Sequence, residues 1–369
     1  MKNKLLITSA LAGSLLAGTS AIAQTTITGD MALIFSANKK DLSNGLGSTR
    51  GFGRETQLNI SNKGKLNNGM DYAAGFSLEF DGTGLGSTFA TESASISNEN
   101  VYIDLISGNT TFTVGVDHIQ RGYNGAAPQV FNITELMTAA GSTTTYVIGA
   151  ATSESFGAGI MQKVPQIGVT LSAYYAPRSR DTGANDVGAI TSNITSNSSY
   201  ELGWNGVDTF GVKGLTTSYF YNKSDKTSGA YAGDIVGKSY GVAYNFGTFA
   251  IGADKFINEN SVTTATLANE SMKESASAGK HETTRYGLTY AVDKDLTLGV
   301  VKAVTEGSGA GITNSGQEET IKAIQLGYNL GPVALQVSVA KYDQLMASGT
   351  GAVANDNGKL GQIRLTTKF

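Results

Sequence analysis

The stretch GKLGQIRLTTKF, residues 358–369, ends the chain and decides the fold class. Counting back from Phe369, every second residue belongs to a mostly apolar set, and the residues between them are polar. The first set continues with Thr367, Leu365 and Ile363, and the second comprises Lys368, Thr366, Arg364 and Gln362. Successive side chains of a strand point to opposite faces, whereas the last residues of most soluble domains are irregular. The stretch therefore predicts a two-faced strand that runs to the final residue.

The same period of two recurs along the chain after residue 24. Clear examples lie at 71–80, 240–246, 285–292, 324–330 and 333–339. No long segment has the apolar spacing of three and four that indicates an amphipathic helix. The sequence therefore predicts an all-β fold with little helix.

Composition excludes several classes of protein. Only 15% of the residues are charged, against about 25% in ordinary soluble domains, yet no later segment is apolar for long enough to span a membrane as a helix. The chain has no cysteine, so disulfides are excluded. Its formal charge of −3 with no basic block argues against a nucleic-acid partner. His118 and His281 are the only histidines and have no ligand spacing, so neither a metal nor a cofactor is expected.

The first residues, MKNKLLITSALAGSLLAGTSAIAQ, have the three elements of a secretory signal peptide in order. Lys2 and Lys4 form a positive segment, an apolar stretch follows, and small residues around Ile22 form a cleavage site. We expect residues 1–23 to be a signal peptide that is removed after Ala23, and residues 24–369 to form a single β-barrel.

The connections between the expected strands alternate strictly between long and short. Short turns lie at positions such as 107–109, 165–168, 245–248, 293–295 and 329–332, which are rich in turn residues. The eight long, polar connections lie at about 39–50, 82–98, 118–153, 178–198, 222–237, 258–282, 306–319 and 343–358. Counting the strands between them gives about sixteen.

This asymmetry predicts a transmembrane antiparallel β-barrel, with short turns in the periplasm and long loops outside. The terminal strand would close the barrel onto TTITGDMALIF, residues 25–35, because an open edge would leave backbone groups unpaired in lipid. The expected partner of the outer face is outer-membrane lipid. Candidates for the aromatic girdle at the membrane interface are Phe369, Tyr72, Tyr200, Trp204, Tyr219, Tyr240, Tyr286 and Phe246.

Parity also predicts which charged side chains face the interior. The inward set is Asp30, Glu55, Glu79, Asp104, Asp117, Lys163, Glu201, Arg285 and Arg364. Acids outnumber bases in this set, which favours cations. Lys255, Lys302 and Arg54 have the outward parity, where they would extend to lipid headgroups or mark bulges in the strands.

The chain resembles the general porins of Gram-negative bacteria, most closely the alphaproteobacterial type. The resemblance rests on the signal peptide, the alternation of strands and loops, the ending IRLTTKF, and the segment QKVPQIGVTLSAYYA at 162–176. It implies a water-filled outer-membrane channel through which ions and small hydrophilic solutes diffuse passively. It also implies a homotrimer, and a terminal strand ending in Phe369 that the outer-membrane assembly machinery recognises.

In this family the third long loop folds into the lumen and narrows the pore. The corresponding loop here contains RGYNGAAPQVFNITELM, residues 121–137, and lacks the acidic Pro-Glu-Phe-type motif of enteric porins. The resemblance pairs acids near the loop with a basic cluster on the wall. The constriction candidates are Asp117, Glu135, Arg121, Arg285 and Arg364. Each of them reads equally well as an ordinary solvated charge.

Two alternatives to a general diffusion channel are an enzyme and a substrate-specific channel. An enzyme is not expected, because nothing near His118 supports a catalytic triad. A substrate-specific channel, for example one selective for sugars, is the closer alternative and would carry an aromatic ladder along one wall. Tyr102, Tyr123, Tyr174 and Phe220 are the aromatic residues that would contribute to it.

Overall fold

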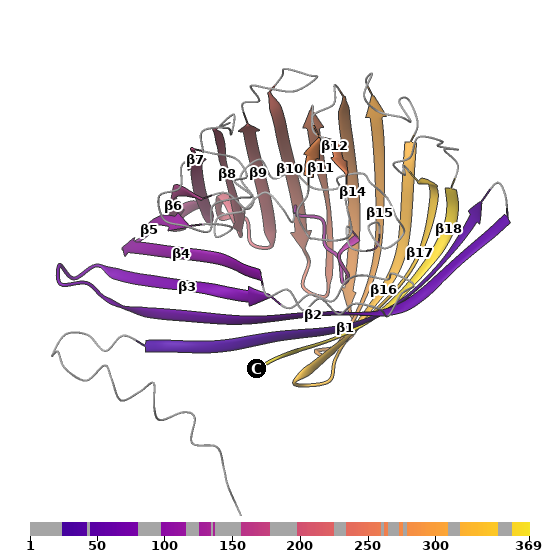
Figure 1. The fold of residues 1–369 in the computed structure, drawn as a ribbon, viewed down its shortest axis with the longest axis horizontal. Coiled ribbons are helices and arrows are strands. Elements are labelled where there is room, and N and C mark those ends of the chain that lie inside the picture. The colour runs from indigo at the N-terminus through magenta and orange to yellow at the C-terminus, as the bar shows by residue number, and fades with distance from the viewer. Residues whose placement is uncertain are drawn as a thin grey trace, which may run out of the picture.

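The protein folds as a closed antiparallel β-barrel, seen in a computed structural model (Figure 1). The structure describes residues 24–42, 45–79, 97–115, 125–133, 136, 156–177, 198–224, 234–259, 262–264, 273–275, 279–308, 318–345 and 356–369. Within these ranges sixteen strands form the barrel, and β12 and β13 form a separate two-stranded sheet. The predicted all-β fold and the strand count are confirmed.

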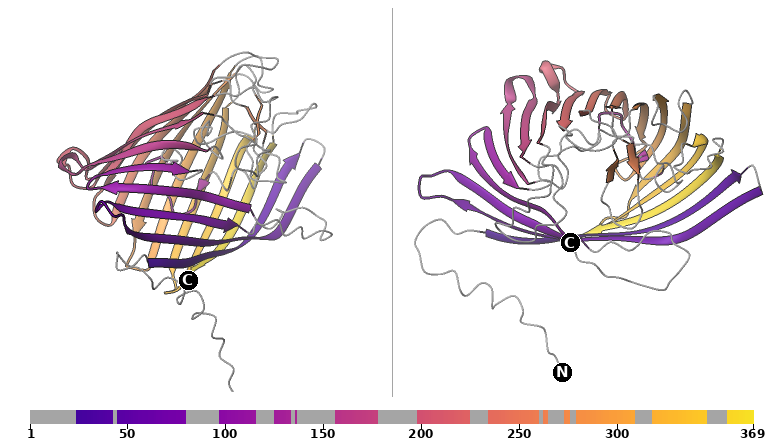
Figure 2. Two further views of the ribbon diagram at one scale, coloured as in Figure 1. Left: turned by 60° about the vertical axis from the view of Figure 1, so that its left-hand side comes forward. Right: turned by 45° about the horizontal axis from the view of Figure 1, so that its top comes forward.

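The strands follow one another around the wall in chain order, as the colour gradient in Figure 2 shows. The barrel strands are β1 (Gln24–Leu42), β2 (Gly45–Lys65), β3 (Asp71–Glu79), β4 (Ser97–Ser107), β5 (Thr110–Gly115), β6 (Gly157–Val164), β7 (Val169–Ala176), β8 (Ser199–Val207), β9 (Leu215–Ser224), β10 (Ile235–Asn245), β11 (Phe249–Glu259), β14 (Lys280–Ala291), β15 (Leu296–Ser308), β16 (Glu318–Asn329), β17 (Val333–Leu345) and β18 (Asp356–Lys368). The separate pair is β12 (Val262–Thr264) and β13 (Lys273–Ser275).

The last strand closes the barrel onto the first. β18 pairs with both β17 and β1, and Leu365 lies opposite Leu33. Phe369 extends the pairing by one residue, because its N–H and C=O exchange hydrogen bonds of 2.9 and 2.7 Å with Gly29. The aromatic ring of Phe369 covers Gly29 so closely that a Cβ there would collide with it. Closure leaves no unpaired edge for lipid to meet.

The two faces of the wall differ in exposure. On β14, Tyr286 and Leu288 are exposed, whereas Thr283 and Arg285 on the opposite parity are buried. Aromatic side chains gather on the outer face of β8 to β10, where Tyr219 lies 4.9 Å from Trp204 and 5.4 Å from Tyr240 between ring centroids. An outer face that exposes large apolar side chains is the face expected to meet lipid.

The short connections are tight turns. Pro165–Ile167 form one turn of 3-10 helix that Gly168 ends in the left-handed conformation, with its N–H donating to the Pro165 carbonyl at 3.2 Å. Among the described segments, no helix is long and apolar enough to cross a membrane.

The first long connection is shorter than the sequence predicts. Residues 39–50 were expected to form a loop, but β1 continues to Leu42 and β2 begins at Gly45. Their polar composition suggested a loop because a spanning strand needs an apolar face. A hairpin that extends beyond the hydrocarbon layer does not need an apolar face.

Candidate pore constriction

The connection between β5 and β6 reaches back to the inner face of the barrel wall. Its described residues are 125–133 and 136. Asp254 of β11 accepts two backbone hydrogen bonds from this segment at its Oδ2 atom, from Ala126 N–H at 3.0 Å and from Ala127 N–H at 2.8 Å. We call residues 125–133 together with Leu136 the inner segment. Because it lies against the side chains of the inward parity, it occupies the interior of the barrel.

Asp254 is held in turn by Arg285, its direct neighbour on β14. The guanidinium donates from Nε to Oδ1 at 2.7 Å and from Nη2 to Oδ2 at 2.8 Å, so the pair is bidentate. Both side chains are almost completely buried, with exposures of 1% for Arg285 and 0% for Asp254. The guanidinium also lies 4.6 Å from the ring centroid of Phe256. The two charges neutralise each other beneath the inner segment.

Two glutamines hold the inner segment further along. Gln325 of β16 accepts hydrogen bonds at Oε1 from Val130 N–H at 2.8 Å and Phe131 N–H at 3.0 Å. Its Nε2 donates to the Phe131 carbonyl at 2.7 Å. Gln336 of β17 donates to the Val130 carbonyl, also at 2.7 Å. The backbone N–H and C=O groups of Val130 and Phe131 are therefore all hydrogen-bonded to side chains of the wall.

A small apolar cluster anchors the end of the inner segment. Phe131, Ile133 and Leu136 are buried against the wall. The wall contributes Val301, Ala303, Ile321, Ala323, Ala340, Tyr342 and Leu360 to the cluster. Burying a large apolar side chain stabilises by about 1.5–3 kcal/mol, so three of them fix the segment firmly.

Glycines on the wall let the segment approach closely. A Cβ at Gly287 of β14 would collide with the Pro128 carbonyl oxygen, and one at Gly241 of β10 would meet Ala126. The backbone of the segment rests where the wall has no side chains.

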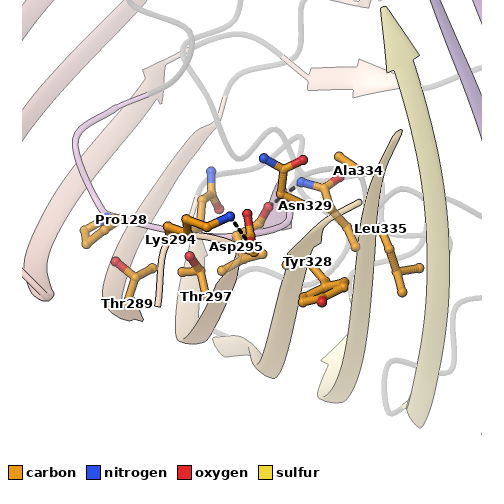
Figure 3. A pocket seen from close by; sticks show the side chains of 13 residues that line it. Pro128, Thr289, Lys294, Asp295, Thr297, Tyr328, Asn329, Ala334 and Leu335 are labelled. Carbon is orange, nitrogen blue, oxygen red and sulfur yellow. Dashed lines mark hydrogen bonds and ion pairs between the residues drawn. The ribbon is translucent and has the colours of Figure 1, made fainter. Parts of the chain in front are cut away.

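A hollow of about 440 Å³ lies beside the inner segment (Figure 3). Pro128, Gln129 and Val130 line it from the segment, and Thr289 and Thr297 line it from the wall. The lining also includes Lys294 and Asp295 from the turn between β14 and β15, so the hollow lies near the short-turn end of the barrel.

The sequence candidates for the constriction fall in different places. Arg285 lies under the inner segment, where its charge does not border open space. Arg364 is on the inner face of β18 and pairs with Glu55 of β2 at 2.6 Å. Asp117, Arg121 and Glu135 lie outside the described residues.

The other charges expected in the lumen have the inward parity. Asp30 pairs with Lys368 at 3.2 Å, and Glu79 accepts a hydrogen bond from Gln57 at 2.8 Å. Asp104 and Glu201 lie on the same face and are largely buried. Lys163 lies opposite Thr170 on this face.

Among the described residues, the inward aromatic side chains do not form an exposed ladder. Tyr174 and Phe220 have the inward parity, but their exposures are only 6% and 1%. Tyr174 donates a hydrogen bond to the Gly115 carbonyl at 2.7 Å. Tyr102 lies on the same face and is half-buried, and Tyr123 is outside the described residues.

Sequence reasoning missed Asp254 and Gln325 as residues of the site. The alternation that places Lys255 outward also places Asp254 inward, so a signal for the aspartate existed. The period of two at 324–330 likewise places Gln325 inward, but nothing local indicated its partners, which are about two hundred residues away in the sequence. In the part of the chain that the structure describes, no group of three or more His, Cys, Asp or Glu residues is placed to hold a metal ion.

A closed barrel with an exposed apolar outer face, a polar inner face and a segment folded inside defines a transmembrane channel. The family model described as Gram-negative porin matches residues 8–346, so the chain belongs to that family. It is an outer-membrane channel for passive diffusion. Its family and fold are those of a channel rather than an enzyme.

Solved structures with the same fold are distant in sequence. The anion-selective porin from Comamonas acidovorans has a TM-score of 0.60 and 13% identity, over 94% of this chain and 100% of that chain. The outer membrane channel DcaP of Acinetobacter baumannii has a TM-score of 0.59 and 14% identity, over 96% and 100%. The trimer form of OmpT from Vibrio cholerae has a TM-score of 0.58 and 13% identity, over 94% and 99%. No curated protein matches the chain.

Proposed function

We propose that the inner segment sets the aperture of this channel, and that Asp254 and Gln325 hold it in position. The observation that carries the proposal is that these two side chains satisfy four backbone N–H groups of the segment. A segment tied to the wall at two points, with an apolar cluster beyond them, keeps one position and so defines one pore size.

Charges on the inner face would then select among ions. Arg285 is neutralised by Asp254, and Arg364 and Lys368 each pair with an acid, so these three bases contribute little net positive charge. Among the other charges that the alternation places inward, Glu79, Asp104 and Glu201 are acids and Lys163 is a base. This balance supports a weak cation preference, in contrast to the porin from Comamonas acidovorans, which is anion-selective.

The chain would be exported and assembled as its relatives suggest. The positive segment, apolar stretch and small-residue site at the start of the sequence support a signal peptide at 1–23. The trimer form of Vibrio cholerae OmpT supports a homotrimer. Phe369, which closes the barrel onto Gly29, is the proposed signal for the assembly machinery.

A channel specific for one sugar is less well supported. Sugar rings would stack on exposed aromatic faces, and Tyr174 and Phe220 are buried.

Single-channel recording on the refolded chain in a planar bilayer tests the proposal. Under a salt gradient we expect conductance steps in threes and a reversal potential of the sign produced by cations. Conductance steps that do not come in groups of three would contradict the trimer, and a reversal potential of the sign produced by anions would contradict the charge assignment. A folded barrel without conductance would contradict an open aperture.

A further inference from the structure

The hollow beside the inner segment is lined on the wall by small side chains. Val130 of the segment lies over Gly299 and Gly327, where an added Cβ would come within 3.0 and 2.8 Å of its methyl carbons. Towards the short-turn end the lining continues with Thr297 and Ala334. The volume of about 440 Å³ is typical of sites that bind small molecules, so the hollow has room for a small solute.

Two amide side chains of the lining each use only one of their two polar ends. Gln129 accepts the Ile133 N–H at Oε1 at 3.1 Å, so its Nε2 group remains a donor. Gln336 donates from Nε2 to the Val130 carbonyl at 2.7 Å, so its Oε1 atom remains an acceptor. No described residue pairs with either remaining atom. Because the bonds already made fix the orientation of each amide, the lining carries one placed donor and one placed acceptor.

The lining also carries both signs of charge (Figure 3). Lys294 and Asp295 are neighbours in the turn between β14 and β15, and their side chains pair at 2.6 Å. The lysine side chain is 86% exposed. An exposed pair of this kind contributes little to stability. Each member can therefore exchange its partner for a charge on a bound molecule at little cost.

The backbone around this charge pair is held in position. Asp293 accepts the N–H groups of Asp295 and Leu296 at 2.7 and 2.8 Å. The Asp295 carbonyl accepts the N–H of Asn329, which also lines the hollow, at 2.8 Å. The Asn329 Oδ1 atom accepts the Gly331 N–H at 2.9 Å, so its amide donors remain. A frame that is already ordered loses little conformational entropy when a molecule binds.

We propose that this hollow binds small zwitterions, the chemical class of amino acids and short peptides. The ammonium group of such a molecule pairs with Asp295 and its carboxylate pairs with Lys294, so both charges of the turn keep a partner. A peptide group between them bonds to the hydroxyls of Thr289 and Thr297, which have no partner among the described residues. The proposal assigns a solute-binding site to the inner face of the channel.

Molecules with one charge or none fit the hollow less well. An anion that takes Lys294 leaves the Asp295 carboxylate without its partner, and a cation that takes Asp295 leaves the ammonium group unpaired. A neutral polyol uses neither charge. Only a molecule that carries both charges satisfies the two side chains together.

The site rests on the proposed function in one respect, because Pro128, Gln129 and Val130 of the inner segment form part of the lining. The test therefore measures binding to the full chain in detergent, which does not depend on conductance. Binding without conductance would contradict the open aperture and support the site. Conductance without binding would contradict the site and leave the aperture intact.

Isothermal titration calorimetry at pH 7 compares four probes of similar size. Glycylglycine carries both charges, N-acetylglycine only the carboxylate, glycinamide only the ammonium group, and N-acetylglycinamide neither. We expect glycylglycine to bind best, and each singly charged probe to bind about tenfold more weakly, because one charge-assisted contact is missing. The neutral probe should give no measurable binding.

Two double variants locate the site. K294Q/D295N removes the charge pair of the hollow and should weaken the binding of glycylglycine about tenfold. The matched control is K65Q/D71N, because Lys65 and Asp71 also form an exposed pair at 2.6 Å, flanking the turn between β2 and β3 at the same end of the barrel. It should bind glycylglycine as the wild type does. The fluorescence of the single tryptophan, Trp204, shows whether each variant is folded.

Three results would overturn the proposal. The first is equal affinity of the wild type for all four probes, which needs no variant. The second is wild-type affinity for glycylglycine in folded K294Q/D295N. The third is an equal loss of affinity in K294Q/D295N and K65Q/D71N, which would show a general effect of charge at the short-turn end instead of a site.

Discussion

Asp254 has two structural tasks, since it neutralises Arg285 and accepts two N–H groups of the inner segment. Removing only the acid leaves a buried guanidinium without its counter-charge, which typically costs about 3–5 kcal/mol. We therefore expect D254L to lower the free energy of unfolding by that amount. The double variant D254L/R285M should recover most of the loss, because apolar side chains often replace a buried pair at little cost.

Urea unfolding monitored through Trp204 measures both variants. Bilayer recording separates the two tasks, since the double variant regains stability but still lacks the acceptor for Ala126 and Ala127, and its conductance should stay altered. Equal destabilisation by the single and double variants would show that the charge pair is not what the fold depends on.

Gln325 offers a test of the second attachment point. Q325L removes two accepted hydrogen bonds and one donated bond, each worth about 0.5–1.5 kcal/mol. We expect a mobile inner segment, seen as fluctuating conductance instead of one steady level. Gln362 is the matched control, because it is also a buried inward glutamine but bonds to Ser36 of the wall at 2.8 Å. Fluctuations of the same size in Q362L would show that Gln325 has no special part in holding the inner segment.

The alternation of side chains along each strand predicted that Arg285, Arg364 and Glu55 lie on the inner face of the barrel. It gave no information about which segments cover them. Arg285 is buried because a segment more than 150 residues earlier in the chain lies over it. Alternation along one strand is local, whereas exposure depends on contacts between distant segments. For the same reason Asp254 and Gln325 could not be identified as attachment points.

At the scale of elements, the turn between β14 and β15 depends on a titrating side chain. Asp293 Oδ1 accepts the N–H groups of Asp295 and Leu296 at 2.7 and 2.8 Å. These backbone hydrogen bonds hold the pKa of Asp293 below its ordinary value of 3.8. A lowered pKa in the folded state stabilises the fold above the unfolded pKa, and this stabilisation is lost as the pH falls through the folded value.

We expect D293A to be less stable than the wild type at neutral pH and to approach it at pH values below about 4. Urea unfolding across this pH range measures the difference. Asn329 in the turn before β17 accepts the Gly331 N–H at 2.9 Å through a group that does not titrate. N329A should therefore show a deficit that does not vary with pH. A D293A deficit that persists in acid would contradict the assignment.

Strands and turns were predictable at this scale because lipid imposes a period of two and Asn, Asp, Gly and Pro mark the turns. The prediction failed at residues 39–50, where β1 and β2 continue as a hairpin beyond the apolar band. Polar strands outside the membrane have no pattern that distinguishes them from loops.

At the scale of the whole molecule, closure follows from the ends of the chain. Because every backbone group in hydrocarbon must be paired, a strand ending at Phe369 had to meet the strand that starts the barrel, and it does so at Gly29. The need to pair backbone groups in hydrocarbon does not determine where the inner segment lies. The contacts of the segment with the wall fix its position.

The most direct measurement is the single-channel conductance of a variant in which residues 120–150 are replaced by a short Gly-Ser linker. If the inner segment sets the aperture, the variant should conduct more than the wild type and admit larger neutral polymers, with a barrel that still resists heat in detergent. An unchanged conductance and polymer limit in a folded barrel would place the narrowest point elsewhere and contradict the account.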